Sequence, residues 1–168
     1  NIAASNFEAA HTLITMLTER YNGVVDTLYT TENSKIQAGS FVAERFDFIA
    51  SYVHEGSLAS MDATEKFIVA QGEILSTNLF ARYLQEQEVS ASLLSAFDFM
   101  RIDSGGEPDH EYISKELKGI VAANPTTDLF ITQGYICLSH DGEIDNLKRG
   151  GSDYSASLIG AAIQAEEI

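Results

Sequence analysis

The sequence predicts an α/β protein with a helical N-terminal portion followed by a mainly parallel sheet. No proline occurs before Pro108, and apolar residues recur at helical spacing through much of residues 7–87. Beyond residue 88, short apolar runs alternate with polar turns and helical segments. We therefore expect one domain over residues 1–168, mainly helical over 1–87 and strand-containing over 88–168.

Three helices are expected in the first part, over residues 7–28, 41–53 and 62–87. Gly39 is expected to separate the first two, because glycine weakens the interior of a helix. Asp62 opens an Asp-Ala-Thr-Glu sequence, which can cap the start of the third helix.

Short strands are expected in the second part, over residues 89–97, 128–132 and 135–138, with 143–146 as a returning hairpin arm. The strand over 128–132 lacks alternation, which is typical of a strand buried on both faces. Residues 102–108 form a turn region with two glycines, after which Asp109 can cap a helix. The last helix is expected to begin near Ser152.

The charge of the chain excludes two classes of partner. It has 10 basic and 25 acidic residues, a net charge of -15, whereas nucleic acids and anionic membranes require clustered Lys and Arg. No apolar run reaches the about 18 residues that a membrane span needs. The single cysteine, Cys137, allows no internal disulfide and favours a reducing cytoplasm. The histidines show no metal-ligand spacing, so we expect no metal site.

Residues 148–153, here called the glycine loop, carry the chemistry that stands out in this sequence. They read Lys-Arg-Gly-Gly-Ser-Asp and lead into a helix of small and apolar residues. Backbone N–H groups and the positive end of a helix dipole meet at such a junction and favour a bound anion. The guanidinium of Arg149 can form a bidentate contact with a carboxylate or phosphate. Asp153, in the first helical turn, can receive a substrate ammonium.

Three segments in the same order resemble the aspartokinases, in the amino acid kinase superfamily. The glycine loop and its helix resemble the substrate loop of that family. Residues 69–77 (Val-Ala-Gln-Gly-Glu-Ile-Leu-Ser-Thr) resemble its Gly-Glu helix start, and residues 131–136 (Ile-Thr-Gln-Gly-Tyr-Ile) resemble the strand and turn before the loop. The resemblance runs from about residue 63 to residue 167 and implies a partial amino-acid-kinase-like fold.

The resemblance implies transfer of the ATP γ-phosphoryl group, with Mg²⁺, to the side-chain carboxylate of L-aspartate. This is the first step of the lysine, threonine and methionine pathway. Arg149 would hold a substrate carboxylate, while Glu73 and Asp153 would receive the ammonium; Arg149 and Asp153 are the expected catalytic residues. The whole implied substrate site consists of Glu73, Tyr135, Arg149, Gly150, Gly151, Ser152 and Asp153.

Some family features are not found in the sequence. It has no Lys-Phe-Gly-Gly-Thr-Ser segment and no Trp, whereas the nucleotide-binding part of the family opens with a Trp-Thr-Asp type strand. The resemblance thus implies an internal piece of a catalytic domain, which we expect to be inactive alone. Lys148 stands where the family usually has glycine.

Two alternatives remain open on these residues. One is another amino acid kinase, acting on glutamate or carbamate. The other is a non-catalytic module for amino-acid binding or oligomerisation, in which the long helices provide the face of a homo-oligomer.

Overall fold

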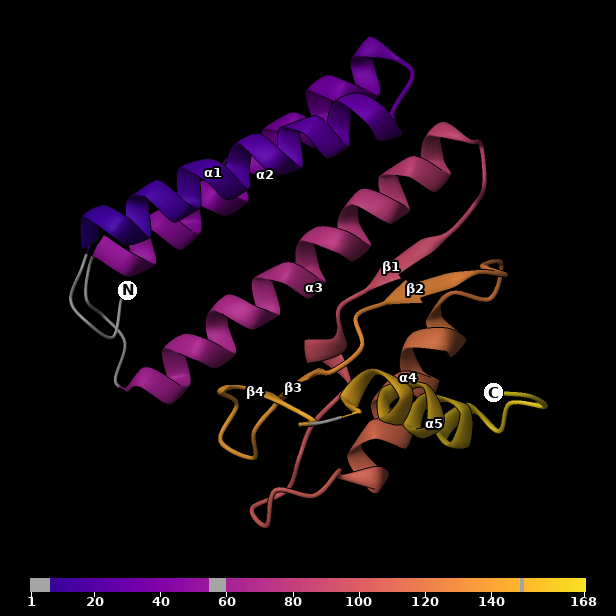
Figure 1. Cartoon of the computed structure of the whole chain (residues 1–168). Helices are drawn as coiled ribbons and strands as arrows, with labels where there is room; N and C mark the ends of the chain where they lie inside the picture. The colour runs from indigo at the N-terminus through magenta and orange to yellow at the C-terminus, as the bar shows by residue number, and fades with distance from the viewer. Residues whose placement is uncertain (1–6, 55–59, 149) are drawn as a thin grey trace. The chain divides into compact units, whose positions relative to one another are not determined.

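The computed structural model describes residues 7–54, 60–148 and 150–168. The chain forms two compact units, Asn1–Val89 and Ser90–Ile168. The described residues of the first unit form three long helices, and the second unit combines short strands with two helices (Figure 1). The fold is α/β, as the sequence predicts.

The helices of the first unit are α1 (Phe7–Leu28), α2 (Glu32–His54) and α3 (Met61–Glu86). Within the unit, α2 packs against both α1 and α3. The buried apolar side chains of this unit include Tyr29, Val42, Phe46, Ile49, Phe67, Leu75 and Leu79.

Gly39 does not separate two helices, and that expectation was wrong. Helix α2 begins at Glu32 and continues through Gly39. Its neighbours Ala38 and Val42 are both fully buried, so packing of this face outweighs the cost of about 1 kcal/mol for glycine in a helix interior.

The start of α3 also differs from the expectation. Ser60 caps the helix, because its Oγ accepts a hydrogen bond from the Ala63 N–H at 3.1 Å. Asp62 lies in the first turn and pairs with Lys66 at 2.9 Å. The Gly-Glu pair, which the family resemblance places at a helix start, lies in the interior of α3, where Gly72 has open space around its Cα.

Two polar contacts tie α3 to the start of α2 and the turn before it. The Tyr29 hydroxyl donates to the Leu79 carbonyl at 2.6 Å. The Glu86 carboxylate accepts from the backbone N–H groups of Thr30 and Thr31 and from the Thr31 hydroxyl. These hydrogen bonds lower the pKa of Glu86 to about 2.

The second unit contains two small sheets. Strand β1 (Ser92–Leu94) pairs in parallel with β2 (Phe130–Thr132), and β3 (Ile136–Leu138) pairs antiparallel with β4 (Ile144–Asn146). Helix α4 (His110–Ala123) connects β1 to β2 in sequence and packs against α5 (Gly151–Ile163).

Two details of this unit differ from the sequence-based expectation, and the start of α5 lies next to its expected position. Strand β1 is shorter than residues 89–97, because a 3₁₀ helix, η1 (Ala96–Asp98), takes over after Leu94. Strand β2 is half-buried throughout rather than buried on both faces. Gly150 is the N-cap of α5, so the helix starts one residue before Ser152, at Gly151.

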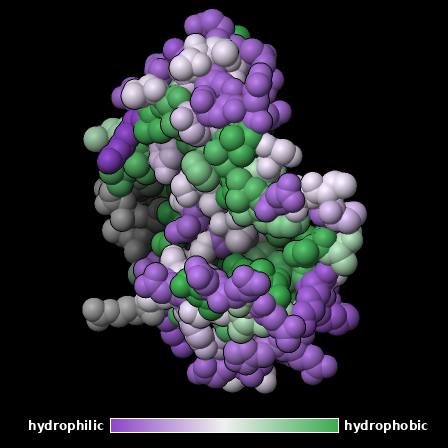
Figure 2. All heavy atoms as spheres, turned by 90° about the vertical axis from the view of Figure 1, so that its right-hand side faces the viewer, coloured by the Kyte–Doolittle hydropathy of each residue, from purple (hydrophilic) through white to green (hydrophobic). Residues whose placement is uncertain are grey.

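The surface agrees with the composition of the chain. Figure 2 shows hydrophilic side chains over much of the face it draws, with apolar patches between them. Within the described ranges, none of the helices combines the length and apolar character that crossing a bilayer demands.

Candidate functional site

The turn between β2 and β3, residues 133–136, is here called the tyrosine turn. Tyr135 lies at its centre with φ +69°, and the Ile136 N–H donates to the Gly134 carbonyl at 2.7 Å. A bond between residues two apart around a positive φ is the signature of a classic γ-turn. For a residue other than glycine this conformation costs about 1–3 kcal/mol, so the surrounding structure must hold it in place.

Contacts on both sides hold the tyrosine turn. The Tyr135 N–H donates to Ser155 Oγ at 2.9 Å, and the Tyr135 carbonyl accepts from the Leu147 N–H at 2.8 Å. Gln133 is buried, and its Oε1 accepts from the Ala96 N–H at 2.8 Å. The turn is therefore fixed to α5, to the end of the β3–β4 hairpin and to η1.

The described part of the glycine loop has an unusual backbone. Lys148 and Gly150 both have left-handed conformations, with φ of +60° and +75°. The Gly151 N–H donates to the Lys148 carbonyl at 3.0 Å, which closes the loop onto the start of α5. Gly150 is the N-cap of α5 and has no side chain to cap it; Ser152 and Asp153 lie in the first turn of the helix, and both side chains are exposed.

The glycine loop and the tyrosine turn pack directly on each other. A Cβ at Gly151 would lie 2.6 Å from Cδ2 of the Tyr135 ring. A Cβ at Gly134 would lie 3.2 Å from Cα of Ser152. A Cβ at Gly151 would overlap the Tyr135 ring, and one at Gly134 would require Ser152 to shift slightly, so glycine at both positions lets the two segments meet without displacement.

The structure thus brings together five of the seven implied site residues in the second unit: Tyr135, Gly150, Gly151, Ser152 and Asp153. Arg149 lies outside the described residues. Glu73 belongs to the first unit, on α3.

Glu73 is a half-buried carboxylate in an apolar stretch of α3. Burial raises its pKa above the ordinary value. Within the described part of the chain, its carboxylate has no hydrogen bond and no ion pair. Binding of a cationic group stabilises a carboxylate in this state.

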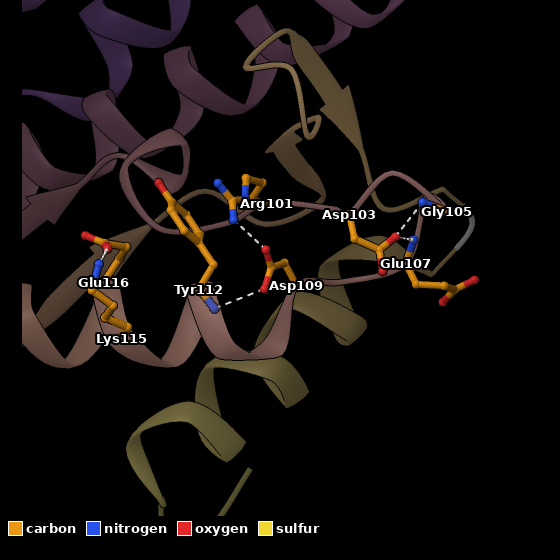
Figure 3. Close-up of polar contacts among 8 residues, drawn as sticks. All are labelled: Arg101, Asp103, Gly105, Glu107, Asp109, Tyr112, Lys115 and Glu116. Atoms are coloured by element: carbon orange, nitrogen blue, oxygen red, sulfur yellow. Dashed lines mark hydrogen bonds and ion pairs between the residues drawn. The ribbon is translucent and has the colours of Figure 1, made fainter.

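A second polar cluster lies at the start of α4 (Figure 3). The Arg101 guanidinium pairs with Asp109 and stacks on the Tyr112 ring, 3.7 Å from the ring centroid. Asp109 also caps α4, accepting from the Tyr112 N–H at 3.1 Å. The hydrogen bond from Arg101 holds the pKa of Asp109 below its usual value. Asp103 closes the adjoining turn by accepting from the N–H groups of Gly105 and Glu107.

This cluster connects to the site through the backbone of strand β3. The backbone on either side of Arg101 pairs with Leu138: the Leu138 N–H donates to the Met100 carbonyl, and the Ile102 N–H donates to the Leu138 carbonyl. The Arg101–Asp109 pair therefore anchors the hairpin whose second strand leads into the glycine loop.

Two residues that hold the site were not singled out from the sequence. Ser155 and Gln133 are polar, nearly fully buried, and hydrogen-bonded to backbone groups of other segments. Their positions in the sequence could have indicated this role, because each is a polar residue within or beside an apolar run that adjoins the proposed site. No group of three or more His, Cys, Asp or Glu side chains within the described ranges is arranged to hold a metal ion.

Comparisons with known proteins agree with the resemblance inferred from the three segments. The model of the amino acid kinase family matches residues 10–168. The lysine-sensitive aspartokinase 3 of Escherichia coli is 32% identical over 115 residues, which are 67% of this chain and 26% of that protein. The aspartokinase of Chlamydia muridarum is 32% identical over 104 residues, 60% of this chain and 23% of that protein.

Solved structures give the same result. Aspartokinase III of E. coli in complex with lysine and aspartate has a TM-score of 0.72 at 25% identity, covering 95% of this chain and 34% of that one. The same enzyme with aspartate and ADP has a TM-score of 0.69 at 26% identity, covering 97% of this chain and 35% of that one. By sequence alignment, the chain spans 26% and 23% of these two relatives.

Proposed function

Because the chain belongs to the amino acid kinase family, we propose that it is the aspartate-binding part of an aspartate kinase catalytic domain. The observation that carries this proposal is the close packing of the tyrosine turn on the glycine loop at the start of α5. Support comes from the likeness to E. coli aspartokinase III, whose solved structures contain aspartate and ADP.

In the proposed reaction, the side-chain carboxylate of L-aspartate attacks the γ-phosphorus of ATP, and ADP leaves. Two anions must approach each other, so the protein contributes mainly positioning and charge neutralisation. Arg149 would hold a substrate carboxylate. Around it, Gly150, Gly151 and Ser152 would supply hydrogen-bond donors next to the positive end of the α5 dipole.

The family resemblance assigns the substrate ammonium to acidic side chains. Glu73 and Asp153 are proposed to receive it, and the ring of Tyr135 would flank the bound amino acid. Mg²⁺ would accompany ATP and offset phosphate charge; the described residues offer it no cluster of three or more acidic, His or Cys ligands. The product would enter lysine, threonine and methionine synthesis, and the single buried cysteine suits a cytoplasmic enzyme.

The test uses the full-length protein that contains this chain. The protein is incubated with Mg-ATP and aspartate, glutamate or carbamate, and the acyl phosphate formed from each acceptor is trapped with hydroxylamine. We expect turnover with aspartate alone. Turnover with glutamate or carbamate instead would favour another amino acid kinase, and no turnover with any of them would favour the non-catalytic module.

Arg149→Ala tests the assigned carboxylate contact. We expect a large rise in KM for aspartate, since truncating one partner of a buried charge pair typically costs about 2–5 kcal/mol. Arg149→Lys should restore binding only in part, because an ammonium cannot form the planar bidentate contact. The control is Arg20→Ala, which removes an exposed arginine from α1. Unchanged aspartate kinetics in Arg149→Ala would contradict the assignment.

A further inference from the structure

Ser155 joins the two segments that form the proposed aspartate site. Its Oγ accepts from the Tyr135 N–H at 2.9 Å and donates to the Gly151 carbonyl at 2.8 Å. A hydroxyl has one proton and two lone pairs, so it makes both bonds at once. The side chain is 2% exposed, which leaves water little access to replace either bond.

The Tyr135 N–H depends on this hydroxyl. In the tyrosine turn, the internal hydrogen bond uses the N–H of Ile136 rather than that of Tyr135. The β3–β4 ladder begins only at Ile136, so it offers the Tyr135 N–H no partner either. A backbone N–H that loses its partner at a poorly solvated position destabilises the conformation that holds it there.

The bond to Tyr135 also affects the glycine loop through direct contact. The Tyr135 ring lies against the Cα of Gly151, close enough to exclude even a methyl group. A change in the backbone of Tyr135 would therefore shift its ring and release Gly151, whose carbonyl Ser155 also holds.

We propose that Ser155 is a positioning residue, which holds Tyr135 in its left-handed conformation and thereby sets the aspartate-binding shape of the glycine loop. This inference rests on the proposed function. In this role Ser155 does not touch the substrate. It acts through Tyr135 and Gly151, the two residues with which its hydroxyl forms hydrogen bonds.

Ser157 provides a matched control on the same helix. Its Oγ donates to the carbonyl four residues earlier, that of Asp153, at 3.0 Å. Ser155 makes the same kind of bond within α5. Ser157, however, is exposed, and among the described residues its hydroxyl reaches only its own helix. The two serines therefore differ in the contact to the tyrosine turn.

The kinetic test compares variants of the full-length protein. For Ser155→Ala we expect KM for aspartate to rise about ten-fold, equivalent to about 1.4 kcal/mol, with KM for ATP unchanged. A general loss of folded protein would lower kcat without this selective change in KM. Ser155→Thr keeps the hydroxyl and should restore most of the aspartate affinity. Ser157→Ala should match the wild type in both KM values.

Hydrogen–deuterium exchange gives a second readout that does not depend on activity. Peptides covering residues 133–138 should exchange faster in Ser155→Ala than in the wild type, because the Tyr135 N–H has lost its acceptor. The same peptides should be unchanged in Ser157→Ala and protected again in Ser155→Thr.

The outcomes separate this inference from the proposed function. A wild-type protein that does not phosphorylate aspartate would overturn the proposed function. An active wild type, with Ser155→Ala unchanged in KM for aspartate and in exchange, would overturn the role of Ser155 alone. Should Ser155→Ala fail to fold, Ser155→Cys decides, because a thiol has similar volume but is a weak hydrogen-bonding group; wild-type KM in that variant would overturn the inference.

Discussion

One methyl group at position 151 tests the packing between the glycine loop and the tyrosine turn. In Gly151→Ala the new Cβ would lie 2.6 Å from the Tyr135 ring and 3.2 Å from Leu147 Cβ. We expect a loss of about 1–3 kcal/mol in the free energy of unfolding, as for other overpacked sites, measured by chemical denaturation.

Gly119→Ala is the matched control for this variant. Gly119 is an exposed residue of α4 with open space around its Cα. Alanine there should raise stability slightly, because it favours the helix. Equal behaviour of the two variants would show that the contact at Gly151 does not constrain the loop.

Glu73 should make the chain less stable as the pH rises. Its folded pKa is raised by burial, so between its ordinary pKa and the raised value the folded state holds more protons than the unfolded state. Stability therefore falls across that window and stays lower above it. Glu73→Gln should abolish this loss and raise the Tm at neutral pH, while it weakens aspartate binding in the full-length protein.

Thermal unfolding between pH 4 and pH 8 measures the effect of Glu73→Gln. Glu65→Gln is the control, since Glu65 is exposed on the same helix. If Glu73→Gln and Glu65→Gln shift the Tm equally at every pH, the claim that the Glu73 carboxylate is buried without a partner is wrong.

Some features at this scale could not be predicted from the sequence. The sequence showed Lys148 where the related family usually has glycine, and its left-handed φ of +60° gives the physical reason for that preference. Nothing in the residues around Tyr135 indicates that it would share this conformation. A γ-turn at a non-glycine residue depends on contacts from Leu147 and Ser155, which lie 12 and 20 residues away in the chain.

At the scale of elements, Glu86 links the end of α3 to the turn before α2. Its hydrogen bonds to Thr30 and Thr31 lower its pKa to about 2. The folded state thus binds fewer protons than the unfolded state between the ordinary pKa and about 2. The stabilisation is present above that ordinary value and is lost as the pH falls through the window.

Glu86→Gln should therefore lower the Tm at neutral pH and have a smaller effect near pH 2, because protonation already weakens the native contact there. Glu44→Gln provides a charge-matched control, from an exposed position on α2. Circular dichroism melts at both pH values give the measurement. An equal drop in Tm for both variants at neutral pH would indicate a general effect of charge rather than the tie between α2 and α3.

The long periodic helices were predictable, and strands β2, β3 and β4 also lie within about two residues of their expected ranges, whereas β1 does not. The patterns of α1, α3 and α4 placed these helices within a few residues of their observed ends. The expectation at Gly39 was wrong because it relied on the low helix propensity of glycine, which is a weak effect. Burial of the neighbouring residues Ala38 and Val42 outweighs it, and that burial is known only from the fold. Strand β1 has only three residues, Ser92–Leu94, so its apolar run continues into a 3₁₀ helix that periodicity cannot distinguish from a strand.

At the scale of the whole molecule, the residues that the family resemblance implies are divided between the two compact units, with Glu73 in the first and the others in the second. The contiguous motif placed Gly150, Gly151, Ser152 and Asp153 together without any knowledge of the fold. Their contact with the tyrosine turn required the β3–β4 hairpin to bring residue 147 back beside Tyr135. Glu73 was assigned to the substrate site through the family resemblance alone, because its spacing on the helix carries no information about the other unit.

We expect the 168-residue chain by itself not to phosphorylate aspartate. Phosphoryl transfer requires donors and cations around the ATP phosphates, yet the sequence contains neither a Lys-Phe-Gly-Gly-Thr-Ser segment nor a Walker-type loop. Its net charge of -15 also disfavours binding of a polyanion. In addition, it spans only 26% of the length of E. coli aspartokinase 3.

The assay incubates the purified chain with Mg-ATP and aspartate and traps aspartyl phosphate with hydroxylamine. E. coli aspartokinase 3 serves as the positive control, and the chain carrying Arg149→Ala serves as the background. We expect the chain and its variant to give the same signal, because aspartate without a bound phosphoryl donor cannot react. Turnover that depends on Arg149 would place a working nucleotide site within these 168 residues, and the acidic surface would then have to contain a local cationic site for ATP.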